Sequence, residues 1–206
     1  MRIGVYPGTF DPIHIGHTYT AQLAAEDQDL QQVIIVPAFC NPHKTATPPN
    51  TSFMYRLGMT ALALERLRPL PHWRTNAWEL SQRRPVHTWE TLSHIQKEHP
   101  GDHISLIIGA DSLISFHKWE RWEWILDNFD VVVVNRPGVS YPPMLASIYD
   151  RVRHVLCNDL AISSTVIRER LSKHLPITNL VTREVENYIY DWGLYRKEHV
   201  NADYQS

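Results

Sequence analysis

Short apolar runs rich in β-branched residues alternate with helical patterns, and this alternation constrains the fold more than any other feature. The runs are Gly4–Tyr6, Val33–Val36, Ile104–Ile108 and Val131–Val134. Continuous apolar runs of this length are typical of strands covered on both faces. Helices are predicted at residues 17–27, 53–67, 88–98, 112–126, 164–173 and 181–192. The alternation predicts an α/β fold, a doubly wound, Rossmann-like parallel sheet with helices on both faces.

The chain length suits one domain with a good-sized hydrophobic core, since it has 206 residues. We expect residues 1–206 to form a single domain with a C-terminal helical portion from about residue 160. No repeat or linker interrupts the pattern. The proline-rich segment 136–150, RPGVSYPPMLASIYD, is predicted to be a mobile loop.

Composition argues against several classes of partner and location. The formal net charge is −2, so we expect no general attraction to nucleic acid or to an anionic membrane. No apolar run approaches the roughly 20 residues that a membrane-spanning helix needs. Cys40 and Cys157 form no C-x-x-C pair, and Met1 leads into a predicted strand without a signal-peptide pattern. We therefore expect a cytoplasmic protein.

The loops that follow the predicted strands carry most of the polar chemistry. In a doubly wound sheet, ligands bind beyond the carboxyl ends of the strands, so these loops should share one crevice. They supply histidine, lysine, arginine and glycine, in segments 7–17, 37–44, 109–112 and 135–138. A hydroxyl-rich helix start at residues 162–168 is a fifth candidate. Cationic side chains together with helix N-termini predict a polyphosphate site.

His14 and His17 stand at the mouth of the first predicted helix. Two imidazoles alone make a poor zinc site, and no H-E-x-x-H pattern supplies more ligands. Helix capping or plain packing is the alternative for an isolated pair. Because glycines and a proline frame this pair at a strand end, phosphate binding is favoured. The chain has neither a G-x-S-x-G elbow nor a Walker loop.

Several motifs, in order along nearly the whole chain, resemble those of known families. GTFDPIHIGH together with ISSTVIR is similar to the nucleotidylyltransferase superfamily, in which an H-x-G-H pair binds ATP phosphates. Four further segments resemble one branch, nicotinate mononucleotide adenylyltransferase: VPAFCNPHK, IIGADSLISFHKW, RPG and VENYIYDWGLYR. The resemblance implies transfer of the adenylyl group of ATP to nicotinate mononucleotide, with release of pyrophosphate.

The sequence departs from the usual pattern of that branch at two places. Pro7 stands where the branch has glycine, and phosphopantetheine adenylyltransferases carry proline there. That rival branch lacks the G-x-D-x-x-x-x-F-x-x-W pattern that runs from Gly109 to Trp119. Val86 and His87 replace the usual serine and tyrosine in the loop that helps to hold the pyridine ring. We hypothesise that His87 adds partial positive charge near the nicotinate carboxylate and so favours the acid over the amide.

The resemblance also assigns roles to individual residues. Catalytic roles fall to His14 and His17 on the α- and β-phosphates, to Lys44 on the reacting phosphates and to Arg168 on the triphosphate tail. The implied ATP-binding residues are Gly8, Thr9, Phe10, Gly109, Asp111, Ile162 and Ser163. The implied mononucleotide-binding residues are Thr88, Trp119, Arg136 and His87.

No protein side chain is expected to hold a resident metal ion. Mg²⁺ is expected to accompany ATP, bound mainly through phosphate oxygens and water. The expected partners are ATP and nicotinate mononucleotide, and the sequence leaves a homo-oligomer open.

Alternatives remain for single residues and for the function as a whole. Asp111 is a candidate helix N-cap, Trp119 a candidate core residue and Arg136 a candidate solvated loop residue. A nucleotide-binding module without turnover is one other class, but four cationic residues are more than binding needs. A tRNA synthetase fragment is another, since H-I-G-H also marks that superfamily, although K-M-S-K-S and a basic surplus are lacking.

Overall fold

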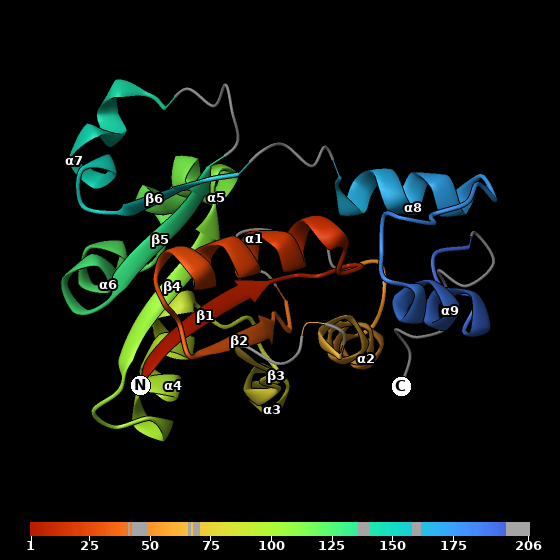
Figure 1. The fold of residues 1–206 in the computed structure, drawn as a ribbon, viewed down its shortest axis with the longest axis horizontal. Helices are drawn as coiled ribbons and strands as arrows, with labels where there is room; N and C mark the ends of the chain where they lie inside the picture. The colour runs from red at the N-terminus through yellow and green to blue at the C-terminus, as the bar shows by residue number, and fades with distance from the viewer. Residues whose placement is uncertain are drawn as a thin grey trace.

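The computed structural model describes residues 1–40, 42, 49–65, 67, 71–135, 141–157 and 162–196. Within these residues, six strands form one parallel sheet in the order β3-β2-β1-β4-β5-β6 (Figure 1). The strands are β1 (Arg2–Gly8), β2 (Gln32–Pro37), β3 (His72–Thr75), β4 (His103–Gly109), β5 (Asp130–Asn135) and β6 (Arg153–Leu156). The order reverses between β1 and β4, which is the switch point of a doubly wound sheet. The predicted fold class is confirmed.

The central strands are apolar throughout because helices cover both of their faces. Alternate residues point to opposite sides of a sheet, and the buried strand residues accordingly divide between two hydrophobic clusters. In β2, Val33 and Ile35 join one cluster, while Ile34 and Val36 join the other. The four predicted apolar runs lie within β1, β2, β4 and β5.

Helices from different parts of the chain cover the two faces. The first cluster includes residues of α1 (Ile15–Asp27), α2 (Phe53–Leu64), α8 (Ser164–Ser172) and α9 (Arg183–Asp191). The second includes residues of α4 (Thr88–Glu98), α5 (Ala110–Ser115), α6 (Trp122–Asn128) and α7 (Ala146–Tyr149). In Figure 1, α2, α8 and α9 lie together at one end of the molecule, and α2 contacts α9 directly. The helices near the C-terminus thus share a core with the sheet.

Two strands and a short helix were not predicted. In the edge strand β3 (HWRT) exposed and half-buried residues alternate, and in the other edge strand β6 (RHVL) Val155 alone is buried. Such short, half-polar edges lack the continuous apolar signal of a central strand. The five-residue helix α3 (Trp78–Gln82) follows β3 and is equally short of periodic signal.

The predicted helix over residues 112–126 is wrong as a single element. It is divided into α5, a 3-10 turn η1 (Phe116–Lys118) and α6. Trp119 adopts an extended conformation with ψ 143°, and Arg121 is left-handed with φ 55°. The aromatic residues on several faces do not form one apolar stripe, so the chain turns instead and both halves pack inward.

The predicted loop over residues 136–150 is wrong in its second half. Residues 143–145 form a 3-10 turn, η2 (Pro143–Leu145), and α7 follows it. Leu145 and Ile148 are buried in the second hydrophobic cluster, so this part packs against the core. Residues 136–140 lie outside the described part of the chain.

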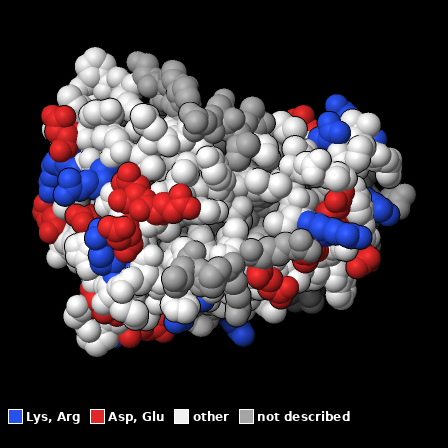
Figure 2. Space-filling model, viewed as in Figure 1, with Lys and Arg blue, Asp and Glu red and all other residues white. Residues whose placement is uncertain are grey.

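The described surface has mixed charge. On the face seen in Figure 2, Lys and Arg are interspersed with Asp and Glu, and no continuous basic stripe crosses that face. Among the described residues, none of the helices combines the length and the apolar character required to cross a bilayer.

Candidate functional site

One large cavity opens at the carboxyl ends of the central strands, at the switch point between β1 and β4. Its volume is about 520 Å³, within the range of small-molecule sites. Its walls come from the loops after the central strands and from the starts of α1, α4, α5 and α8. Of the predicted site residues, the lining includes Gly8, Thr9, Phe10, His14, His17, Thr88, Gly109, Asp111, Trp119 and Arg168.

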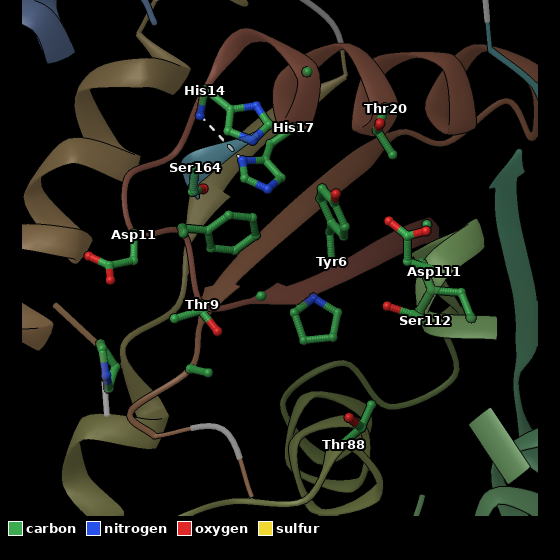
Figure 3. A pocket seen from close by; sticks show the side chains of 18 of the residues that line it. Tyr6, Thr9, Asp11, His14, His17, Thr20, Thr88, Asp111, Ser112 and Ser164 are labelled. Atoms are coloured by element: carbon green, nitrogen blue, oxygen red, sulfur yellow. Dashed lines mark hydrogen bonds between the residues drawn. The ribbon is translucent and has the colours of Figure 1, made fainter. Parts of the chain in front are cut away.

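The two histidines form a stacked pair at the start of α1. Their ring centroids are 3.6 Å apart with an interplanar angle of 22°. His14 is the N-cap residue and is 5% exposed, whereas His17 is half-buried. The backbone N–H of His14 donates to Nδ1 of His17 at 3.3 Å (Figure 3). His14 and His17 therefore both cap α1 and line the cavity.

Gly16 leaves the room that the stacked pair needs. A Cβ atom at this position would lie 3.0 Å from Nδ1 and 3.1 Å from Cε1 of His14. Contacts this short would require the His14 ring to shift by a few tenths of an ångström. The glycine between the histidines thus has a steric reason in this structure.

The loop after β1 folds over an aromatic support. Phe10 is 2% exposed and has a left-handed backbone with φ 48°. Its ring meets His17 edge-on, with centroids 5.0 Å apart. A Cβ at Gly8 would lie 2.7 Å from the Phe10 ring, so only glycine lets the backbone pass this close.

Asp11 holds this loop in place through its buried carboxylate. Its carboxylate is 4% exposed and accepts hydrogen bonds from the Asn50 backbone N–H at 2.7 Å and from the Tyr195 hydroxyl at 2.9 Å. Burial, with the Asp11 carboxylate close by, raises the pKa of Tyr195 well above its ordinary value. The hydroxyl therefore stays protonated at neutral pH and remains a donor to Asp11.

The start of α8 is tied to the same loop. Arg168 donates to the backbone carbonyl of Asp11 at 2.7 Å, and Ser164 donates to that of Pro12 at 2.9 Å. Ser163 is the N-cap residue of α8 and accepts from the Val166 N–H at 3.2 Å. Ser164, Thr165 and Arg168 line the cavity, whereas Ile162 and Ser163 do not.

Asp111 lies in the first turn of α5, beyond the end of β4. The N-cap residue of that helix is Gly109, so the alternative assignment of Asp111 as the N-cap is wrong. A Cβ at Gly109 would meet nothing within 4 Å, and this glycine leaves the cavity open at that point. Figure 3 shows Asp111 beside Ser112, across the cavity from the histidine pair.

Val86, Thr88 and Trp119 also line the cavity, and Figure 3 shows Thr88 away from the histidine pair. Thr88 is the first residue of α4. Trp119 is half-buried and packs against Phe116, with ring centroids 5.1 Å apart, so it serves as wall and as partial core.

His87 is not brought to the cavity wall. It is the N-cap residue of α4, and its Nε2 lies 3.1 Å from a carboxylate oxygen of Glu120. In this position Nε2 of His87 pairs with Glu120 rather than with a group in the cavity. Lys44 and Arg136 lie outside the described residues.

Glu79 is a wall residue that the sequence did not indicate. It comes from α3 and is 3% exposed. Burial raises the pKa of its carboxyl group to about 7, although hydrogen bonds from Phe39 and Thr91 and the charge of Arg56 oppose that shift. No motif was identified around Glu79, and the helix α3 that positions it was not predicted.

Among the described residues, no group of three or more His, Cys, Asp or Glu side chains is arranged to hold a metal ion. A hard, oxygen-seeking cation such as Mg²⁺ would find the exposed carboxylate of Asp111 on the wall.

Comparisons with known proteins identify the class. Residues 5–170 match the family model described as Cytidylyltransferase-like. The fold is that of solved adenylyltransferases. A Plasmodium falciparum nicotinic acid mononucleotide adenylyltransferase complexed with NaAD aligns with a TM-score of 0.76 and 21% identity, over 94% of this chain and 97% of that one. A putative nicotinate-nucleotide adenylyltransferase from Vibrio parahaemolyticus aligns with a TM-score of 0.70 and 19% identity, over 95% and 96%.

Curated relatives narrow the class further. A probable nicotinate-nucleotide adenylyltransferase of Shewanella woodyi is 35% identical, over 95% of this chain and all of that one. One from Carboxydothermus hydrogenoformans is 33% identical, over 95% of this chain and 98% of the relative. The chain belongs to the nicotinate-nucleotide adenylyltransferase family, within the cytidylyltransferase-like nucleotidyltransferases. The membership expected from the motifs is confirmed.

Proposed function

We propose that this protein transfers the adenylyl group of ATP to nicotinate mononucleotide, giving nicotinate adenine dinucleotide and pyrophosphate. The observation that carries the proposal is the stacked histidine pair on the wall of a switch-point cavity. Relatives named for this reaction support it over the full length of the chain.

The reaction needs alignment and charge neutralisation more than proton transfer. The second pKa of a phosphomonoester lies near 6, so the attacking phosphate is mostly ionised at pH 7. One of its oxygens bonds to the α-phosphorus of ATP, and the bond from that phosphorus to the oxygen shared with the β-phosphate breaks. Pyrophosphate leaves with the electron pair. The protein's contribution is to hold the two nucleotides in line and to stabilise the transferring group.

His14 and His17 supply hydrogen-bond donors for the phosphates. Nδ1 of His17 accepts from the backbone of His14, so the proton of the neutral ring lies on Nε2, which makes that atom a hydrogen-bond donor. Arg168 and the start of α8 border the same end of the cavity and suit the triphosphate tail. Lys44 completes the proposed catalytic set.

The remaining assignments follow the two ends of the cavity. Gly8, Thr9, Phe10, Gly109 and Asp111 face ATP, and Ile162 and Ser163 contribute through the backbone leading into α8. Thr88 and Trp119 face the pyridine ring, and Arg136 the mononucleotide phosphate. Mg²⁺ bound to ATP neutralises phosphate charge, and Asp111 would position it through water. A cytoplasmic location fits these substrates.

A pyrophosphate-release assay tests this function directly. The wild-type protein, ATP and Mg²⁺ are combined separately with nicotinate mononucleotide, nicotinamide mononucleotide or 4′-phosphopantetheine. We expect release with the first to exceed the others. A preference for phosphopantetheine would contradict the proposal and make Pro7 the informative residue. ATP binding without release from any acceptor would reduce the protein to a binding module.

A further inference from the structure

Glu79 is a carboxylate buried in the wall of the cavity and is part of none of the roles above. Burying an ionisable group is costly unless hydrogen bonds or charges compensate for the lost water. An apolar residue of similar size would fill the same space at lower cost. The contacts of Glu79 therefore need a separate explanation.

The carboxylate joins two segments that form different walls. One oxygen accepts from the backbone N–H of Phe39 at 3.0 Å, in the loop after β2. The other accepts from the hydroxyl of Thr91 at 2.9 Å, in the first turns of α4. Thr91 is 1% exposed and lies one helical turn after Thr88, which lines the cavity. Glu79 thus bridges the β2 loop and the helix that begins at the mononucleotide end.

A buried arginine holds the same loop from its other side. Arg56 is 1% exposed and donates to the carbonyl of Phe39 at 3.0 Å and to that of Ala38 at 2.7 Å. It also donates to the carbonyl of Thr9 at 2.7 Å, in the loop after β1. The residue Phe39 is therefore bound at its N–H by Glu79 and at its carbonyl by Arg56.

We propose that Glu79 is a positioning residue for the mononucleotide: by bonding Phe39 and Thr91 together, it fixes the β2 loop against the start of α4. This inference rests on the proposed function, because it assigns that end of the cavity to nicotinate mononucleotide. Loss of the bridge lets the first turn of α4 move relative to the β2 loop. Binding of the mononucleotide is weakened, while the histidine end keeps its own supports from Phe10 and Asp11.

The test compares the Michaelis constants of the two substrates in Glu79→Leu and Glu79→Gln. Leucine removes both acceptors and leaves the Phe39 N–H and the Thr91 hydroxyl without a partner. Glutamine keeps an acceptor oxygen for Phe39 and offers an N–H to the Thr91 oxygen. We expect Glu79→Leu to raise KM for nicotinate mononucleotide about tenfold or more, with KM for ATP changed by less than about threefold. Glu79→Gln should keep both constants within about threefold of the wild type.

Two outcomes would overturn the proposal: equal changes in both constants for folded Glu79→Leu, or a Glu79→Gln variant as impaired as Glu79→Leu. If Glu79→Leu does not fold, Thr91→Val removes one arm of the bridge alone. It should raise KM for the mononucleotide about three- to tenfold, and an unchanged value would refute the bridge. Wild-type turnover separates the two hypotheses, since its absence refutes the proposed function and its presence with unchanged variants refutes only Glu79.

Discussion

The two ends of the cavity are built in different ways. The histidine end is made at the starts of two helices of nine or more residues, α1 and α8, and its polar groups come from short local motifs. The pyridine end is made from the five-residue helix α3, the start of α4 and the turn at Trp119. Its supports, Arg56 and Glu79, are buried ionisable side chains that bond to backbone far away in sequence.

This difference has a physical consequence for how the ends respond to change. At the histidine end, donors aimed at phosphate act in the transition state, so their loss should lower kcat. At the pyridine end, the supports act through geometry and should affect binding of one substrate. Variants at the two ends are therefore expected to give separable kinetic and thermodynamic signatures.

The largest effect is expected at the histidine end. His17→Ala should lower kcat by about a hundredfold or more, as for the removal of a preorganised donor. The ring is half-buried and caps α1, so folding should survive with a modest loss of stability. Steady-state kinetics and a thermal melt measure both, with the exposed His72→Ala as a matched control. A kcat within about threefold of the wild type would make His17 structural.

The next effect is a pH dependence of stability at the pyridine end. The pKa of Glu79 is raised to about 7 in the folded protein by burial, with Glu90 adding to the rise and Arg56 opposing it. The unfolded chain releases this proton near its ordinary value of 4.5. The neutral carboxyl group therefore makes its full contribution to the free energy of unfolding below pH 4.5, and this contribution is lost as the pH rises through 7. The free energy of unfolding of the wild type should fall by about 2.5 kcal/mol relative to Glu79→Gln between pH 5 and 8.

Urea denaturation of both proteins at these two pH values measures that difference. Because glutamine does not titrate, it reports every other pH-dependent contribution. A wild-type-to-variant difference that stays constant with pH would show that Glu79 has an ordinary pKa in the folded state.

A smaller effect is expected for the hydrogen bond between Tyr195 and Asp11, which supports the loop at the histidine end. Tyr195→Phe removes the hydroxyl that donates to Asp11 at 2.9 Å. Losing this buried bond should cost about 1–2 kcal/mol of unfolding free energy. Asn50 still binds Asp11 through its backbone and side-chain amides, so kcat should fall less than about tenfold. Chemical denaturation paired with kinetics provides the check. A loss of kcat as large as that of His17→Ala would mean that Tyr195 acts on the reacting groups.

The smallest effect is expected for His87, because its ring nitrogen pairs with Glu120 and it does not line the cavity. His87→Ala should leave the ratio of kcat/KM for the acid to that for the amide within about threefold of the wild type. Parallel assays with the two mononucleotides give this ratio. A pronounced loss of acid preference would instead revive the hypothesis that His87 supplies charge to the nicotinate carboxylate.

The contrast between the ends also explains what could be predicted from the sequence. The central strands were predicted because runs such as Val131–Val134 are covered on both faces, and the loop holding His14 and His17 followed from the strand before it. Glu79 was not predicted, since its role depends on contacts with Phe39 and Thr91 that no local spacing encodes. The resemblance assigned Trp119 to the mononucleotide site. The turn at Phe116–Lys118 that precedes it was not predicted, because residues 112–126 were predicted as one helix.

A crystal structure with nicotinate adenine dinucleotide bound would test the assignment of the two ends most directly. The account predicts the pyrophosphate linkage beside His14 and His17 and the pyridine ring against Trp119 and Thr88. It also predicts unchanged bonds from Glu79 to Phe39 and Thr91. A dinucleotide bound in the opposite direction, with its pyridine ring at the histidine pair, would contradict the account.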